Sequence, residues 1–150
     1  MEKALDEVLS HGARENLPVS KIIERLLAIE ADSLIERRIE RRINDSKLPD
    51  RKLLSDFDFV FQKGIEKSRI MELATLSFVE RKQGLILAGS SGTGKSHLAK
   101  ALLLIGCTNL YRCRYTTASA MLKDLLASLA DGTLEQKLKV YTRPDILLID

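Results

Sequence analysis

The sequence GLILAGSSGTGKSHLAKALLLIG, residues 84–106, joins an apolar run to a loop rich in glycine and then to a helix-forming segment. The loop, Gly89–Ser96, matches the pattern G-x-x-x-x-G-K-[ST] at every required position. The apolar run Leu85–Ala88 is typical of a short buried strand, and the residues after the loop are typical of an amphipathic helix. A strand before such a loop and a helix after it are the context of a phosphate-binding loop, so the sequence predicts a nucleotide site here.

The residue types of this loop suit a polyphosphate. Its three glycines permit turns that larger residues avoid and let backbone amides approach the phosphates. Lys95 is predicted to reach the β- and γ-phosphates, and the Ser96 hydroxyl to bind Mg²⁺. The alternative is a glycine-rich turn without a ligand. The candidate nucleotide-binding residues are Gly89, Ser90, Ser91, Gly92, Thr93, Gly94, Lys95, Ser96 and His97. Among these, His97 is a lone histidine inside a helix, where packing or exposure explains it as well as ligand binding.

A second acidic position ends the chain, in the sequence DILLID, residues 145–150. Four apolar residues that run into Asp150 indicate a buried strand with a carboxylate at its C-terminal end. After a phosphate loop, such a carboxylate is expected to hold Mg²⁺ through water. Lys95 and Asp150 are therefore the candidate catalytic residues, and Ser96 and Asp150 the candidate metal site. The alternative is a strand that simply ends in an acidic residue.

Hydrophobic periodicity predicts an α/β chain with a parallel sheet and crossover helices. A cluster of three phenylalanines at 57, 59 and 61 marks a connecting segment, which either packs on the next domain or forms a wall for a bound base. The expected helices span residues 2–11, 19–48, 65–82, 94–106 and 118–130. The expected strands span residues 84–88, 111–118 and 145–150, with a polar connection at 131–144.

Composition adds limits on the class of protein. The chain has 150 residues and a formal net charge of only +3, which alone does not argue for a nucleic-acid partner. No apolar run approaches the roughly 20 residues of a membrane span. Its two cysteines, Cys107 and Cys113, lack metal-ligand spacing and are expected to be buried thiols. These features predict a soluble, cytoplasmic protein.

A basic segment lies within the long helix predicted at 19–48. Residues 34–52 carry 7 Lys/Arg and 4 Asp/Glu, whereas the acidic residues dominate before them. Four arginines at helical spacings form a stripe that either contacts DNA phosphates or pairs with Glu36 and Glu40 on a solvated face. These candidate DNA contacts are Arg37, Arg38, Arg41 and Arg42.

Four segments together resemble one known family. The sequences LLSDFDF, ELATLSFVERKQGLILAGSSGTGKSHLAKAL, RYTTASAML and RPDILLID look like those of the IstB-like ATPases, helper proteins of insertion-sequence transposition that are similar to DnaC-type helicase loaders. The resemblance runs over essentially the whole chain. It implies an AAA+ P-loop NTPase fold with a three-layer parallel sheet, with Gly89–Ser96 as Walker A and Asp150 as the Walker B aspartate. It also implies ATP with Mg²⁺, homo-oligomers, largely non-specific binding of double-stranded DNA, and regulation of a partner transposase.

The resemblance also raises an expectation about completeness. In this family a catalytic glutamate, sensor residues, an arginine finger and a lid follow Walker B, and a strand from that region separates the two Walker strands. We therefore expect the sheet to be incomplete at its C-terminal side, as in a shortened or clipped form, and we expect weak nucleotide binding with little or no hydrolysis. The expected domains are a helical region at 1–52 for DNA or partner contact, a connector and helix at 53–82, and the N-terminal part of an ATP-binding domain at 83–150.

Two other function classes remain open at this point. One is a DnaC-like loader of a replicative helicase. The other is a hydrolysis-dead interaction fragment that joins intact subunits and inhibits them.

Overall fold

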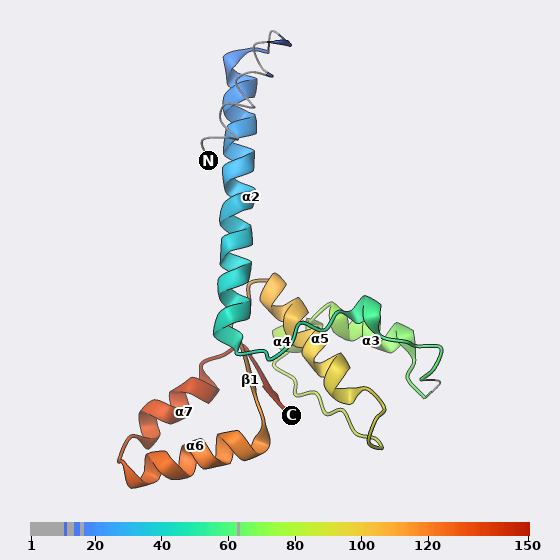
Figure 1. Cartoon of the computed structure of the whole chain (residues 1–150), viewed down its shortest axis with the longest axis vertical. Coiled ribbons are helices and arrows are strands. Elements are labelled where there is room, and N and C mark those ends of the chain that lie inside the picture. The colour runs from blue at the N-terminus through green and yellow to red at the C-terminus, as the bar shows by residue number, and fades with distance from the viewer. Residues whose placement is uncertain (1–10, 12–13, 16, 63) are drawn as a thin grey trace. The chain divides into compact units, whose positions relative to one another are not determined.

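The computed structural model describes residues 11, 14–15, 17–62 and 64–150 (Figure 1). The chain divides into two compact units, Met1–Glu40 and Arg41–Asp150. The described elements are α2 (Val19–Ser46), the 3₁₀ helix η1 (Leu54–Asp56), α3 (Lys67–Ala74), α4 (Ser77–Glu80), α5 (Lys95–Thr108), β1 (Cys113–Thr116), α6 (Ala118–Ala130), α7 (Leu134–Thr142) and β2 (Ile146–Ile149). None of the helices described is both long and apolar enough to cross a membrane.

Helix α2 confirms the long helix predicted at 19–48. It has 28 residues and no internal Gly or Pro. It ends at Ser46, and Lys47 follows with a positive φ of 58°. The helix predicted at 2–11 lies outside the described residues, apart from residue 11.

The second unit contains a small parallel sheet. Strands β1 and β2 pair in parallel, with Cys113 opposite Ile146 and Thr116 opposite Ile149. Helices α6 and α7 connect the two strands, as Figure 1 shows. The predicted combination of α/β structure, parallel strands and a helical crossover is therefore confirmed for this pair.

Helix α5 packs against both strands through a close approach at Gly106. A Cβ atom at this position would lie 2.7 Å from Ile146 Cδ1 and 2.9 Å from Cys113 Sγ. Leu103 and Cys107, on the same helix, are almost completely buried. Both cysteines are free and buried, as predicted. Burial of apolar side chains such as Leu103 stabilises the fold by about 1.5–3 kcal/mol each.

The phenylalanine connector packs onto the core. Phe57 forms a buried cluster with Ile70 and Leu98, and Phe59 packs against it. The rings of Phe57 and Phe59 meet edge to face with centroids 4.8 Å apart. Phe61, in contrast, is 79% exposed. The packing interpretation of this connector is confirmed for Phe57 and Phe59.

The prediction of a single helix at 65–82 is wrong, because the helix is interrupted in its middle. The structure has two shorter helices, α3 and α4, separated by Thr75 and Leu76. Leu76 adopts a left-handed conformation with φ of 60°, while its side chain is only 2% exposed. A left-handed backbone costs about 1–2 kcal/mol for a non-glycine residue, and burial of the leucine side chain offsets that cost.

The strand predicted at 84–88 is also wrong, because these residues have no regular secondary structure. A strand requires a neighbour for its backbone hydrogen bonds. Strand β2 pairs only with β1 in the part of the chain that the structure describes. A cleft of about 690 Å³ is lined by residues 84–87 and by β2. The two stretches therefore lack a shared neighbour in the described structure, as expected, and Ile86 is 89% exposed.

The polar connection predicted at 131–144 contains a helix, α7. Helix α7 packs against α6. Tyr141 is buried, and its hydroxyl donates a hydrogen bond of 2.7 Å to Asp124 Oδ2 on α6. Lys137 forms an ion pair of 3.0 Å with the same carboxylate. These cross-helix contacts are tertiary, so the local sequence did not reveal them.

Candidate functional site

The glycine-rich loop adopts backbone conformations that favour glycine. Gly92 and Gly94 have φ values of 78° and 82°. A Cβ atom on Gly94 would lie 2.4 Å from Phe57 Cε2, whereas one on Gly92 would meet open space. Two features therefore favour glycine at position 94. Its backbone has a positive φ, and the Phe57 ring leaves no room for a side chain.

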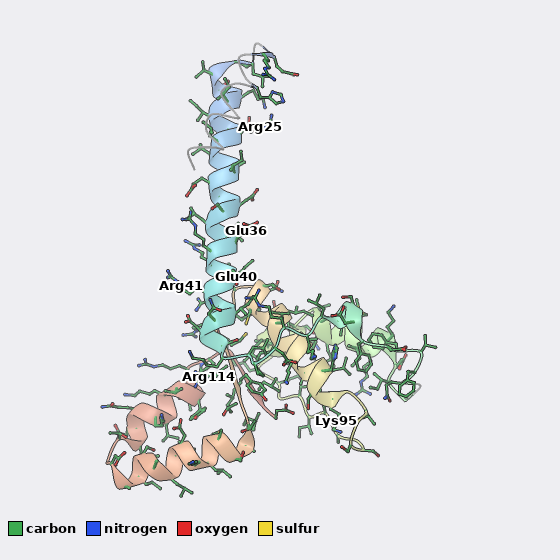
Figure 2. All side chains as sticks on the ribbon, viewed as in Figure 1. Arg25, Glu36, Glu40, Arg41, Lys95 and Arg114 are labelled. Carbon is green, nitrogen blue, oxygen red and sulfur yellow. The ribbon has the colours of Figure 1, made fainter. Side chains whose placement is uncertain are left out.

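Lys95 begins helix α5 and its side chain folds over the loop. Its ammonium donates a hydrogen bond of 2.6 Å to the Ser90 carbonyl and lies 3.5 Å from Thr93 Oγ1. Thr93 Oγ1 donates in turn to the Ser90 carbonyl at 3.0 Å. Figure 2 shows Lys95 at the loop end of α5. The free amides of this helix terminus and the ammonium together place positive charge at the loop.

The loop and the end of strand β2 meet at one contact. The Ser96 hydroxyl donates a hydrogen bond of 2.6 Å to Asp150 Oδ1. The other carboxylate oxygen, Oδ2, accepts a longer bond of 3.4 Å from the Tyr115 hydroxyl on β1. The structure thus brings together the two residues that the sequence predicted as a metal site. It adds Tyr115, which the sequence analysis did not identify.

Tyr115 is itself held by a charged network. The Lys100 ammonium lies 5.5 Å from the centre of the Tyr115 ring and forms an ion pair of 2.9 Å with Asp50. The hydrogen bond with Asp50 raises the pKa of Lys100, and the same bond lowers the pKa of Asp50. Partial burial, followed by the negative charge of Asp150, raises the pKa of Tyr115. Tyr115 therefore stays protonated at neutral pH and can donate to Asp150.

Comparison with known proteins shows which family the chain belongs to. The profile of the family described as "IstB-like ATP binding protein" matches residues 1–150. The chain belongs to the IstB-like ATP-binding protein family. The resemblance seen in the sequence is therefore confirmed.

Several curated relatives of this IstB-like chain are named as insertion-sequence proteins. The insertion sequence IS5376 putative ATP-binding protein of Geobacillus stearothermophilus is 34% identical over 150 residues, which are 100% of this chain and 60% of the relative. The insertion sequence IS21 putative ATP-binding protein of Pseudomonas aeruginosa is 31% identical over 97% of this chain and 55% of its own length. The insertion sequence IS232 putative ATP-binding protein of Bacillus thuringiensis subsp. berliner is 27% identical over 100% of the chain and 60% of its own length. The IstB-like chain thus spans 55–60% of the length of these relatives.

His97 contacts the connector of the IstB-like chain. Its Nε2 lies 2.9 Å from the Leu53 carbonyl oxygen, and its ring meets Phe57 edge to face at 5.5 Å between centroids. These contacts support the packing role considered for His97. Ser90 takes part in the loop through its carbonyl, which accepts the hydrogen bond from Lys95, and Ser91 is exposed.

The arginine stripe of α2 crosses the boundary between the two units of the IstB-like chain. Arg37 pairs with Glu30 at 2.8 Å and donates to the Ser33 carbonyl at 3.2 Å. Arg38 also belongs to the first unit, whereas Arg41 and Arg42 belong to the second. Figure 2 shows Glu36, Glu40 and Arg41 along α2. Arg42 lines a separate basic pocket, which the sequence spacing of the stripe did not predict.

Proposed function

We propose that this chain binds ATP with Mg²⁺ at residues 89–96 and Asp150, within a fold of the AAA+ type, and that it serves DNA transposition as an ATP-dependent helper. The observation that carries this proposal is the 2.6 Å contact between Ser96 Oγ and Asp150 Oδ1. It joins the hydroxyl that ends the phosphate-loop motif to the carboxylate that follows an apolar strand.

The residues at this contact fit a magnesium site. Mg²⁺ prefers oxygen ligands and usually takes only one or two from the protein, with phosphate oxygens and water as the rest. Ser96 would be a direct ligand and Asp150 would hold a bound water. Bound Mg²⁺ would offset the negative charge of the phosphates. Tyr115 keeps Asp150 Oδ2 engaged, which leaves Oδ1 directed toward Ser96.

Phosphate binding requires one local rearrangement. The Lys95 ammonium, which now donates to the Ser90 carbonyl, would exchange this partner for phosphate oxygens. A charge-assisted hydrogen bond to phosphate is stronger than one to a neutral carbonyl, so the exchange is favourable. Gly92 and Gly94 leave the loop amides accessible to the ligand.

The wider role is inferred from the relatives, which are named as insertion-sequence proteins. Within this proposal the chain binds double-stranded DNA largely without sequence preference, acts with a transposase, and assembles with further copies. Residues 83–150 supply the ATP-binding part, residues 53–82 connect it, and residues 1–52 contact DNA or a partner. No specific observation favours a helicase loader or an inhibitory fragment over this role.

A titration of the purified chain with a fluorescent ATP analogue tests the proposal. We expect saturable binding that is stronger with Mg²⁺ and is lost in Lys95→Ala. The matched control is Lys123→Ala, which removes an exposed lysine on α6 outside the loop. Equal binding by wild type and Lys95→Ala would overturn the proposed nucleotide site.

A further inference from the structure

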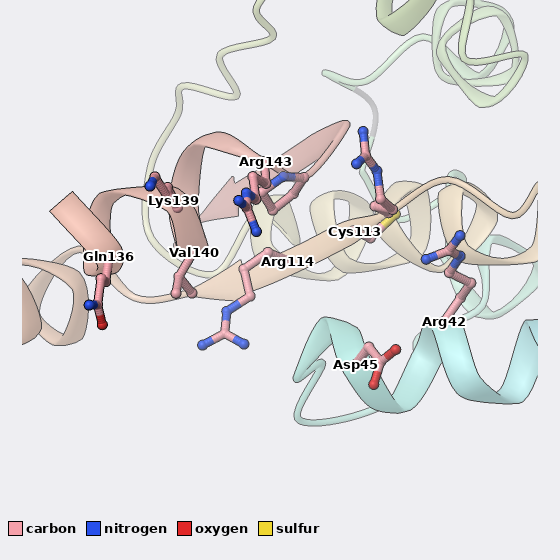
Figure 3. Close-up of a pocket in the computed structure, with 10 residues that line it drawn as sticks. Arg42, Asp45, Cys113, Arg114, Gln136, Lys139, Val140 and Arg143 are labelled. Carbon is pink, nitrogen blue, oxygen red and sulfur yellow. The ribbon is translucent and has the colours of Figure 1, made fainter.

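A second pocket lies within the unit Arg41–Asp150, and its lining is basic (Figure 3). Its volume is about 500 Å³. The charged side chains that line it are Arg42, Arg112, Arg114, Lys139, Arg143 and Asp45. Five cations therefore face one carboxylate. Repulsion among these cations is relieved by a bound anion, so the charge balance points to an anionic ligand.

Internal ion pairs account for only one of these cations. Arg112 binds Asp145 with two hydrogen bonds, 3.1 Å from Nε and 2.7 Å from Nη2. For Arg42, Lys139 and Arg143, the described residues offer no ion pair within 4.0 Å. The pocket consequently retains a surplus of positive charge.

Arg114 differs from the other lining cations because one of its hydrogen-bond donors is buried. It is half-buried on strand β1, and its Nε is buried without a hydrogen-bond acceptor among the described residues. An unsatisfied buried donor carries a desolvation cost. Its guanidinium end projects away from the strand in Figure 3. An anion at that end would accept hydrogen bonds from the Nη nitrogens and stabilise the positive charge, which is delocalised over the whole guanidinium group.

The wall contributed by α2 is anchored to the rest of the pocket. Cys107 Sγ on α5 donates to the Arg42 carbonyl at 3.7 Å. Ser46, one turn later, is fully buried. Arg42 and Asp45 therefore belong to the same folded unit as β1 and α7, and the pocket is a built feature of that unit.

The positions of the cations indicate whether the ligand is one small anion or a row of phosphates. Figure 3 shows Lys139 and Arg143 in one part of the view and Arg42 in another, with the Arg114 guanidinium directed away from both. This spread suits successive phosphates along a strand better than one small anion held at a point. Arginine forks match phosphate oxygens in geometry as well as charge. We propose that this pocket binds backbone phosphates of double-stranded DNA, an inference that rests on the DNA-binding role proposed above.

The pocket and the nucleotide site lie at opposite ends of the same two strands. Cys113 and the Arg112–Asp145 pair lie at the amino ends of β1 and β2, where the pocket is. Asp150 follows the carboxyl end of β2, where the phosphate loop is. Substitutions in the pocket therefore leave the groups that bind ATP in place.

The test compares DNA binding by two double variants. Lys139→Ala/Arg143→Ala removes two exposed cations of the pocket, and Lys123→Ala/Arg81→Ala removes two exposed cations elsewhere in the same unit. Binding of a short fluorescent DNA duplex is followed by anisotropy between about 50 and 200 mM salt. We expect the pocket variant to bind roughly tenfold more weakly, with a salt slope reduced by about two, one unit for each lost phosphate contact. The control variant should bind like wild type.

A third variant should change DNA affinity in the opposite direction. Misfolding would weaken DNA binding, so it cannot explain an increase. Asp45→Asn removes the one carboxylate among the lining side chains and should strengthen DNA binding. Unchanged DNA binding in both the pocket variant and Asp45→Asn would overturn the pocket as the DNA site while leaving the DNA-binding role intact. No DNA binding by wild-type protein that still binds the ATP analogue would overturn the DNA-binding role itself.

A calorimetric titration with inorganic pyrophosphate tests whether the pocket binds a small phosphate compound instead of DNA. Binding of pyrophosphate that is lost in Lys139→Ala/Arg143→Ala, with DNA binding unaffected, would assign the pocket to a small phosphate compound and overturn the proposal. We expect any pyrophosphate binding to be the same in wild type and in Lys139→Ala/Arg143→Ala, because the phosphate loop lies outside the pocket.

Discussion

Ser96 Oγ lies 2.6 Å from Asp150 Oδ1, although 54 positions separate the two residues in the chain. Ser96 is fixed by the first turn of α5, and Asp150 by the end of β2, whose backbone continues the ladder with a 3.0 Å bond from Asp150 N to the Thr116 carbonyl. The contact therefore depends on the packing of α5 against the sheet. In the proposed nucleotide site, this hydroxyl and this carboxylate would lie beside the Mg²⁺ and the phosphates.

Asp150→Asn tests the metal side of this contact. The amide keeps the size of the side chain but loses its negative charge, so the bound water of Mg²⁺ is held less firmly. We expect the Mg²⁺ concentration for half-maximal binding of the ATP analogue to rise roughly 10- to 100-fold. Binding of the analogue without Mg²⁺ should stay near the wild-type level. An unchanged Mg²⁺ dependence would show that Asp150 is not part of the metal site.

Tyr115→Phe tests the positioning of Asp150. It removes a hydrogen bond of 3.4 Å to Oδ2 and leaves the ring in place. A bond of this kind contributes about 0.5–1.5 kcal/mol, so we expect a two- to tenfold rise in the Mg²⁺ concentration for half-maximal binding. Tyr111→Phe, in the turn before β1, is the control and should have no effect. If Tyr115→Phe has the same Mg²⁺ dependence as wild type, the Tyr115 hydroxyl does not position Asp150 and the side chain serves only in packing.

Gly94→Ala and Gly92→Ala form a matched pair in the phosphate loop. Both glycines have positive φ, so each substitution carries a backbone cost of about 1–2 kcal/mol. Only Gly94→Ala adds a clash, because its Cβ would lie 2.4 Å from Phe57 Cε2. Overpacking of this kind costs about 1–3 kcal/mol. Urea unfolding should show Gly94→Ala to be the less stable of the two.

A double variant can separate the steric cost of Gly94→Ala from its backbone cost. Phe57→Leu removes the Cε2 atom, so the double variant Phe57→Leu/Gly94→Ala should show a smaller penalty for Gly94→Ala than the wild-type background does. Additive effects of the two substitutions would contradict the contact between the ring and the loop.

The Arg112–Asp145 pair predicts a pH-dependent stability. Hydrogen bonds from the Arg112 side chain, and then from its backbone N–H, lower the pKa of Asp145 below its ordinary value. The contribution of the pair to stability is therefore present above the unfolded-state pKa of about 3.9 and is lost as pH falls through the lower folded-state pKa. Asp145→Asn should be less stable than wild type at neutral pH.

That difference should shrink as pH falls below about 3.9, because wild-type Asp145 then becomes increasingly protonated and loses its charge. Urea unfolding at pH 7 and near pH 3 measures both conditions. A stability gap that stays constant or widens toward low pH would show that the ion pair is not its cause.

The motifs of the site were readable from the sequence because each is a local pattern. Gly89–Ser96 encodes its own turns through glycine, and the apolar run before Asp150 encodes a strand that ends in an acid. The long helix α2 and the helix α6 were readable for the same reason, since their periodicity and the absence of Gly and Pro operate over consecutive residues. Family membership followed from these segments together.

Other features depended on contacts between distant residues, and the sequence could not supply them. Leu85–Ala88 has the composition of a strand, yet a strand forms only where a neighbour accepts its backbone hydrogen bonds, and the described structure provides none. Helix α7 is held by Tyr141 and Lys137 against Asp124. The turn at Leu76 is tolerated because its side chain is buried.

The sequence by itself determined the phosphate loop, the acidic end of β2 and the α/β class, since these follow from residue types at fixed spacings. Only the tertiary structure decided that Tyr115 contacts Asp150 and that Arg42, Arg114, Lys139 and Arg143 line one pocket. The physical reason is the range of the forces involved. Backbone conformation and periodicity are set over a few consecutive residues, whereas a side-chain site is set by packing, which brings together residues that are far apart in the chain.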